Sequence, residues 1–359
     1  MWPFKSSEQQ YDAVANDEEE LKTTQKDRSR RVIGPTTVWV GIVLVMAAVG
    51  LGELLFRNPH SGSDVPAQEQ LDVSPNEDTK CPQRREWRTL TAIEQQDYIS
   101  AVLCLRTQPS TLTPDSNKTA YDDYPWIHSH VGYFTHNSAP FLPWHRYFLH
   151  IYESTLRNQC GYNGGLVYWD WTLDSEALEK SPVFDATTGF GGDGEVGGEI
   201  TVGRSGRCLV DGPFTNITAD YYDVKYLPHC LSRGFRDLDG SLGHINGHDI
   251  SPESIEEVLS LTEYESFVAL MESRVHDAIP FGIGGDFETF TAPYDLDRLW
   301  WLWQQRQPDK GLSSYGGHKQ RHSMEMASMD DEIIMQALAP SVKVAEVMGV
   351  EGQLLCYRY

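Results

Sequence analysis

Three histidines, His128, His136 and His145, lie within one stretch of 18 residues that is rich in aromatic side chains. Neutral imidazole is a common ligand for copper and zinc in proteins. A single histidine on an apolar helix face is usually a core residue with satisfied hydrogen bonds, but three of them among aromatic residues indicate a metal site. Their spacing alone does not identify the metal.

The segment around His145 has the pattern of an amphipathic helix from about residue 144 to residue 156. His145, Leu149, Tyr152 and Leu156 recur at helical spacing, so they share one stripe that we expect to face the core. His145 should therefore point into the protein.

Helical patterns recur along the rest of the chain. A capping-box pattern at Thr91–Glu94 precedes a helix, and a second one at Thr262–Glu265 is expected to open a helix that runs to His276. A further amphipathic helix is predicted over 296–303, whereas the glycine-rich stretch 186–215 predicts a long surface loop. Strand patterns are short and scattered, so the sequence predicts a mainly α domain.

The residues around the three histidines form a specific pattern. It includes residues 121–123, the block Phe141-Leu142-Pro143-Trp144-His145-Arg146, and the run Tyr168-Trp169-Asp170-Trp171. This pattern resembles the first copper half of fungal tyrosinases, and the resemblance extends over about residues 81–310. It implies that His128, His136 and His145 bind the first copper ion, whereas His130 and His150 match no ligand position.

The resemblance implies a tyrosinase-type helical bundle around a binuclear copper site, with long loops and few short strands. It also implies a copper-dependent phenol oxidase or monooxygenase that uses O₂ to hydroxylate phenols and to oxidise catechols to quinones. The expected partner is a phenolic small molecule or a tyrosine-containing peptide. By analogy the setting would be fungal pigment or secondary-metabolite synthesis, including peptide mycotoxins. Phe141 is expected near the first site, and Asp297 with Arg298 is expected to brace the bundle.

The second copper site of the family has two histidines four residues apart on one helix and a third on the next helix. His276 occupies the first of these positions, but Pro280 stands four residues later and offers no donor atom. The segment that carries the third ligand in the family is missing immediately before Leu296. The cofactor is therefore expected to be one or two copper ions.

Other histidines are weaker candidates for the second site. His244 and His248 have the required spacing, but the glycines at 243 and 247 disfavour a stable helix there. His318 and His322 lie in another glycine-containing stretch that we expect to be mobile.

Two interpretations of the incomplete site remain open. The join at Asp295-Leu296 would suit a misplaced splice boundary, or the protein is a degenerate relative with one copper ion or none. Pro280 is a departure that a splice error does not explain. The chain is thus expected to be a copper oxidase with weak or absent activity as written, or a catalytically inactive membrane-anchored accessory protein. An oxygen carrier related to haemocyanin would need the same missing ligands.

Charge and hydropathy divide the chain and exclude one class of partner. The formal net charge of −23 argues against a nucleic-acid partner, since the affinity of proteins for nucleic acid comes mainly from Lys and Arg.

No charged residue lies between Arg31 and Glu53, a run long enough to cross a bilayer as a helix. We therefore expect a cytosolic disordered tail (1–31), a single transmembrane anchor (32–55), a stalk (56–80) and a copper domain (81–359).

The basic residues before the apolar run predict a cytosolic N-terminus and a copper domain in the secretory lumen or outside the cell. All six cysteines follow residue 80, and an oxidising compartment would allow disulfides, although the sequence does not select their pairing. Asn117 and Asn216 begin glycosylation sequons that are usable only in that compartment.

Overall fold

The computed structural model describes residues 81–359 apart from 115, 290–293 and 353. The expected tail, anchor and stalk lie outside the described residues, as does most of the segment just before Leu296. In the described part of the chain, no helix is both long and apolar enough to cross a membrane.

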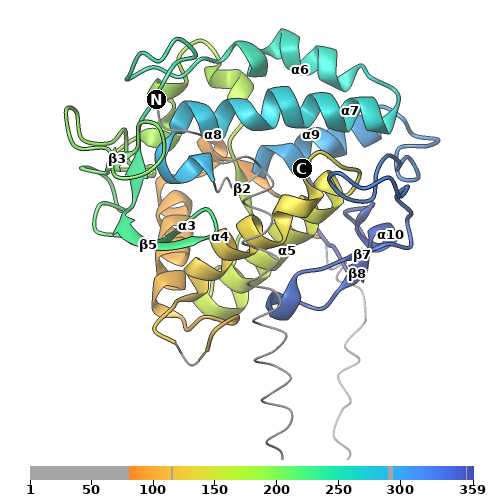
Figure 1. Cartoon of the computed structure of the whole chain (residues 1–359), viewed down its shortest axis with the longest axis horizontal. Coiled ribbons are helices and arrows are strands. Elements are labelled where there is room, and N and C mark those ends of the chain that lie inside the picture. Colours follow the sequence, from red (N-terminus) through yellow and green to blue (C-terminus); the bar gives the residue numbers. More distant parts are fainter. Residues whose placement is uncertain (1–80, 115, 290–293, 353) are drawn as a thin grey trace, which may run out of the picture. The chain divides into compact units, whose positions relative to one another are not determined.

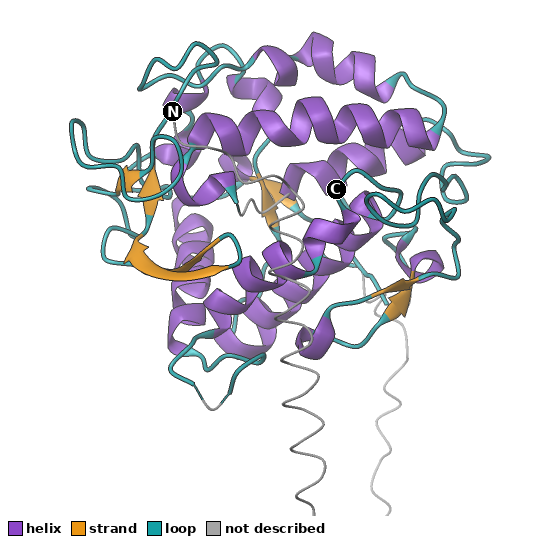
Figure 2. Cartoon of the chain, viewed as in Figure 1, coloured by secondary structure: helices purple, strands orange, loops and turns teal. Residues whose placement is uncertain are grey.

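Helices form most of the regular structure and the strands are short (Figure 2). The prediction of a mainly α domain with few short strands is therefore confirmed. In Figure 1, α3, α4 and α5 lie in the lower half of the view, and α6, α7 and α8 lie in the upper half. The helices are α3 (Ala92–Cys104), α4 (Ala120–His130), α5 (Phe141–Cys160), α6 (Pro252–Leu259), α7 (Tyr264–Leu270), α8 (Asp277–Ile283), α9 (Tyr294–Gln305) and α10 (Val344–Val347).

The strands of the described residues form four two-stranded pairs, of which the first is parallel and the others are antiparallel. The pairs are β1 (Arg85–Glu86) with β2 (Val167–Tyr168), β3 (Arg207–Cys208) with β6 (Ser232–Arg233), β4 (Thr218–Tyr222) with β5 (Lys225–Cys230), and β7 (Glu332–Ile333) with β8 (Val342–Lys343). The predicted loop over 186–215 is irregular backbone apart from β3 and isolated bridges.

The two capping predictions have different outcomes. At α3 the Thr91 hydroxyl accepts from the Glu94 N–H, and the Glu94 carboxylate accepts from the Thr91 N–H, so this capping box is confirmed. At α7 the prediction is wrong, because the N-cap is Glu263 and it makes no side-chain capping hydrogen bond. The Thr262 hydroxyl instead donates to the Glu263 carboxylate. The helix still reaches His276, through a π-helical turn at Met271–His276 that joins α7 to α8.

Three disulfides stabilise this domain. They pair Cys81 with Cys356, Cys104 with Cys160, and Cys208 with Cys230. The first closes a loop of 275 residues and ties together the two ends of the described domain. The second joins the last residues of α3 and α5, and α5 carries His145. Each cross-link restricts the unfolded chain and so raises the free energy of unfolding.

A buried charged network connects α5, α9 and the C-terminal residues. Asp297 on α9 accepts from Arg84 at 2.7 Å and from Arg146 of α5 at 2.5 Å. The hydroxyls of Tyr357 and Tyr359 donate to the same carboxylate. All three charged side chains are almost fully buried, so the network aligns α5, which carries His145, with α9.

Arg298 serves a similar bracing role on the other side of α9. Its guanidinium donates to Asp170 at 2.9 Å and to Asp295 at 3.1 Å. The Asp297–Arg298 pair thus links α9 to distant parts of the chain and does not face the histidines.

Candidate metal centre

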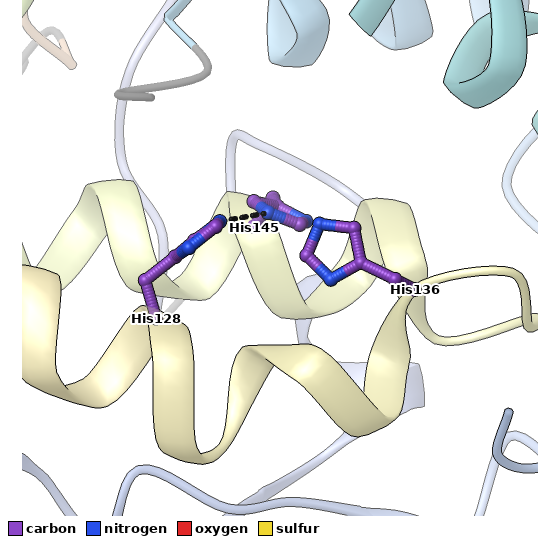
Figure 3. Close-up of side chains that lie close together, drawn as sticks. All are labelled: His128, His136 and His145. Atoms are coloured by element: carbon purple, nitrogen blue, oxygen red, sulfur yellow. Dashed lines mark hydrogen bonds between the residues drawn. The ribbon is translucent and has the colours of Figure 1, made fainter. Parts of the chain in front are cut away.

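His128, His136 and His145 come together from three consecutive elements (Figure 3). His128 lies on α4, His136 follows the short 3-10 turn over residues 132–135, and His145 lies on α5. One ring nitrogen of each lies within 4.8 Å of the other two, and the Nε2 atoms of His128 and His145 are 3.5 Å apart. The inward direction predicted for His145 is therefore observed.

Backbone carbonyls orient two of these rings. Nδ1 of His145 lies 2.7 Å from the carbonyl oxygen of Phe141, and Nδ1 of His136 lies 2.7 Å from that of Gly132. Because a carbonyl oxygen only accepts, each Nδ1 must carry the proton, and each Nε2 keeps its lone pair. Such outer hydrogen bonds hold an imidazole in the tautomer and orientation that bind a metal ion.

Burial keeps all three rings uncharged. Burial first, and then the nearby His276, lower the pKa of His128 to about 3. The pKa values of His136 and His145 also lie well below the ordinary value, first through burial and then through the neighbouring imidazoles. Metal ions bind the neutral ring, so these side chains need to lose no proton before binding.

His276 approaches the same centre from the π-helical turn. Its ring centroid is 5.4 Å from that of His136 and 5.2 Å from that of Phe141. Nδ1 lies 3.1 Å from an oxygen of Asp277, whereas Nε2 is buried and has no hydrogen-bond partner among the described residues. A buried nitrogen without a partner costs about 1–3 kcal/mol, which a bound metal ion would offset. This donor set, imidazole nitrogens in an aromatic setting, suits copper.

The rest of the predicted second site does not assemble in the described residues. Pro280 is buried on α8 and has no donor atom. It also lacks the N–H that would bond to the carbonyl of His276, and the π-helical turn ends at that residue. The Asp277 N–H in this turn reaches back to the carbonyl of Glu272, one residue farther than in an α-helix.

The other histidines considered in the sequence do not join this cluster in the described part of the chain. His244 has irregular backbone and contacts Glu179 at 3.0 Å and Asp237 at 3.7 Å, and His248 is exposed. His130 stacks on Trp126, and His150 stacks on Tyr147. His318 and His322 are exposed in a loop.

Phe141 lies among the imidazoles, as the sequence predicted. Its ring centroid is 4.7 Å from that of His145 and 5.3 Å from that of His136. Together with the contact to His276, these distances place one fully buried phenyl ring against three of the four histidines. Phe141 therefore holds the imidazoles apart at fixed positions and excludes water.

Glu272, which the sequence did not single out, anchors the segment after His136. Its carboxylate accepts from the N–H of Asn137 at 2.8 and 2.9 Å, across 135 residues of sequence. Asn137 has a φ of 53°, a left-handed conformation that asparagine tolerates. Burial raises the pKa of Glu272 to about 7. The only sequence signal was its position one helical turn before His276.

Replacing Glu272 by glutamine should change how the stability of the metal-free protein depends on pH. The folded pKa of about 7 exceeds the ordinary 4.5, so the folded state binds a proton more tightly than the unfolded state. The wild-type protein should therefore lose about 3 kcal/mol relative to the variant as the pH rises from about 4.5 to 7. Urea unfolding of both proteins at pH 5 and pH 8 measures this difference, and an identical pH dependence would contradict it.

An apolar cavity of about 200 Å³ lies beside the centre. Phe148 contributes to its wall and has its ring centroid 6.4 Å from that of His128. Ile279 and Ile283, which follow His276 on α8, line another side. The cavity also reaches Asp295, whose Oδ2 has no hydrogen-bond partner among the described residues. Phe148 thus links the wall of this cavity to His128, although none of the four histidines lines it.

Comparison with known proteins identifies the family. The family model described as the common central domain of tyrosinase matches residues 118–306, which include all four histidines of the centre. The chain is 44% identical over 288 residues to tyrosinase-like protein phomQ2 of Diaporthe leptostromiformis, covering 77% of this chain and 73% of that protein. It is 43% identical over 285 residues to tyrosinase ustQ of Aspergillus flavus, covering 77% and 78%.

A solved structure shows the same fold. The polyphenol oxidase from Thermothelomyces thermophila, crystallised as a point mutant, superposes with a TM-score of 0.67 at 25% sequence identity. The match covers 78% of this chain and 88% of that one. The resemblance inferred from the histidine pattern is therefore confirmed, and the chain belongs to the tyrosinase family of copper-containing oxidoreductases.

Proposed function

We propose that this protein is a copper-dependent oxidase of phenols and catechols, and that His128, His136 and His145 hold a copper ion. The supporting observation is the convergence of three buried, neutral imidazoles. In His136 and His145 a backbone carbonyl holds the Nδ1 side of the ring, which leaves the Nε2 lone pair available for a metal ion. Imidazole is a suitable ligand for copper in proteins.

When bound, copper would exchange electrons with O₂ and with the aromatic substrate. The chain's own residues hold the ligands and keep water away. Phe141 packs against the imidazoles, and Glu272 fixes the segment after His136. A phenolic substrate is supported by the aromatic surroundings and by the similar protein named as a polyphenol oxidase. A tyrosine-containing peptide in fungal secondary metabolism is the narrower proposal.

The histidine centre of the chain as written should bind one copper ion, and the oxidase activity should be weak. His276 is the one described histidine of the second half that faces the centre, and Pro280 replaces a ligand. Metal analysis of reconstituted protein, combined with a catechol oxidation assay, measures both properties. A repaired chain, with the missing segment restored and Pro280→His, should bind two ions and gain activity.

Pro280→Ala in the same repaired background is the matched control, because it removes the proline ring without adding an imidazole. It should keep the lower copper content. Two copper ions bound at the histidine centre of the unmodified protein would contradict the proposed incomplete site.

A second candidate function is that of a catalytically inactive accessory protein, which the incomplete second half favours. Copper bound at the triad without any oxidation of catechols or phenols would support this function over the oxidase.

We further propose that residues 32–55 anchor the protein in a membrane, with residues 1–31 in the cytosol and the copper domain in the secretory lumen or outside the cell. The apolar run supports the anchor, and the paired state of all six cysteines supports an oxidising compartment. The sequon residues Asn117 and Asn216 are both exposed, so a glycosyltransferase could reach them.

Protein expressed in its fungal host should therefore carry glycans on Asn117 and Asn216. Asn117→Gln and Asn216→Gln should each lower the apparent mass on an electrophoresis gel by the mass of one glycan. Treatment of the wild-type protein with a peptide N-glycosidase should lower it by both. Asn158→Gln, at an exposed asparagine outside any sequon, should change nothing. Unchanged mobility of wild-type protein after the glycosidase would contradict a lumenal domain.

A further inference from the structure

Residues 317–327 form a small hairpin, called here the 317–327 hairpin. The Lys319 N–H donates to the carbonyl of Glu325 at 2.8 Å, and the Ala327 N–H donates to that of Gly317 at 2.9 Å. His318 and Met326 lie directly opposite each other as an antiparallel bridge. A turn closed by the Ser323 N–H and the Gln320 carbonyl connects the two sides.

The register of this hairpin places soft metal ligands on one face. Along a strand, alternate residues point to the same face of a two-stranded ribbon, and residues directly opposite each other on the two strands lie near each other. The even-numbered residues are all exposed, whereas the odd-numbered residues from 317 to 323 are less so. The exposed residues of the hairpin are His318, Gln320, His322, Met324, Glu325 and Met326, so Glu325 is the one odd-numbered residue among them.

The two methionines are far more exposed than apolar side chains usually are. Met324 is 86% exposed and Met326 is 65% exposed. Burial in a core removes such side chains from water, so packing within this chain does not explain them. Thioether sulfur is a soft ligand that selects Cu(I), and imidazole also binds copper.

The positive charges of the hairpin lie on its other face. The Lys319 ammonium pairs with Asp331 at 2.9 Å, and the Arg321 guanidinium lies over the ring of Tyr133 at 4.7 Å from its centroid. Both cations are directed toward other parts of the domain, which leaves the face with the methionines open to a monovalent cation.

Backbone hydrogen bonds attach the hairpin to the segment that presents His136. The Ala139 N–H donates to the carbonyl of His318 at 2.8 Å, and the Arg321 N–H donates to the carbonyl of Phe134 at 3.1 Å. These two bonds lie on either side of His136 in the sequence. The soft-ligand face is therefore joined to a residue of the histidine centre by a short, hydrogen-bonded connection.

We propose that the 317–327 hairpin binds Cu(I) at its surface, through the thioethers of Met324 and Met326 and the imidazole of His318, and supplies this ion to the histidine centre. The delivery step rests on the proposed copper function, whereas the surface site does not. Because the receiving imidazoles are already neutral, the transfer moves one metal ion and no electron or proton.

The test is an anaerobic titration of the metal-free full chain with Cu(I) against a chromophoric Cu(I) chelator. Wild-type protein should hold one more Cu(I) ion than Met324→Leu/Met326→Leu, whose surface affinity should fall at least about tenfold. Met329→Leu is the matched control, because this methionine is half-buried and lies outside the hairpin. This variant should behave as wild type. Zn(II) binding should be equal in all three proteins, since thioethers do not favour zinc.

Loading of the centre tests delivery. With limiting Cu(I), the double variant should fill the histidine centre at least about tenfold more slowly, yet the centre should reach the same final occupancy. Equal Cu(I) number and affinity in wild type and double variant would overturn the surface site, and equal loading rates would overturn delivery. If His145→Leu abolishes central binding while the hairpin still binds Cu(I), the surface site stands independently. If the triad binds no copper in wild-type protein, the proposed function fails and the surface site does not.

Discussion

Asp297→Asn is expected to lower the free energy of unfolding by about 3–5 kcal/mol. The wild-type carboxylate is 3% exposed and accepts from Arg84, Arg146, Tyr357 and Tyr359. Removing its charge leaves two buried guanidinium groups without their shared counterion. Breaking a buried ion pair is far more destabilising than loss of a surface pair, because the remaining charges stay desolvated.

Urea unfolding at neutral pH measures the effect, with Asp309→Asn as the control. Asp309 is exposed just beyond α9, so the same change there should alter stability by less than about 0.5 kcal/mol. Glu153 still pairs with Arg84 at 2.7 Å, so the loss should fall mainly on Arg146. A loss no greater than that of the control would show that the network does not support the fold.

The pH dependence of this loss has a defined sign. Burial alone would raise the pKa of Asp297, but Arg146 and Arg84 outweigh it and hold the pKa below the ordinary 3.8. A depressed folded pKa gives stability that is present above the unfolded value and is lost as the pH falls through the folded value. The difference between wild type and Asp297→Asn should therefore persist above about pH 4 and shrink only in stronger acid.

His145→Leu is expected to remove most of the stabilisation that copper gives to the protein. With free copper at about 1,000 times Kd, binding to the folded state adds about 4 kcal/mol to the free energy of unfolding. His145 is 2% exposed and contributes one of the three converging nitrogens. Leucine fills a similar volume without a donor atom, so the metal-free variant should stay folded. Copper affinity at the triad should fall by about 100-fold or more.

Thermal unfolding with and without copper distinguishes loss of binding from loss of structure. His150→Leu is the matched control, because it makes the same substitution on the same helix, outside the cluster. It should keep the full copper-induced rise in Tm. A rise of wild-type size in His145→Leu would show that His145 is not a copper ligand.

Local patterns in the sequence were sufficient for several parts of this centre. The recurrence of Leu149, Tyr152 and Leu156 with His145 showed which face of the helix was apolar, and α5 does direct His145 inward. The Thr91 capping box was also readable, since its two hydrogen bonds join residues three apart. Such features depend on neighbours within one helical turn, which the sequence lists directly. The similar pattern at Thr262 failed because the hydroxyl bonded to Glu263 instead.

Tertiary packing alone decided the remaining features. The contact between Glu272 and Asn137 spans 135 residues, and no periodicity within either segment reports it. The sequence favoured His276 over His244 as a ligand, but only packing turned the first toward His136 and the second toward Glu179. Disulfide pairing and the attachment of the 317–327 hairpin beside His136 are of the same kind. The physical reason is that residue type and spacing determine the face of an element, whereas distances between elements follow from how all their side chains pack together.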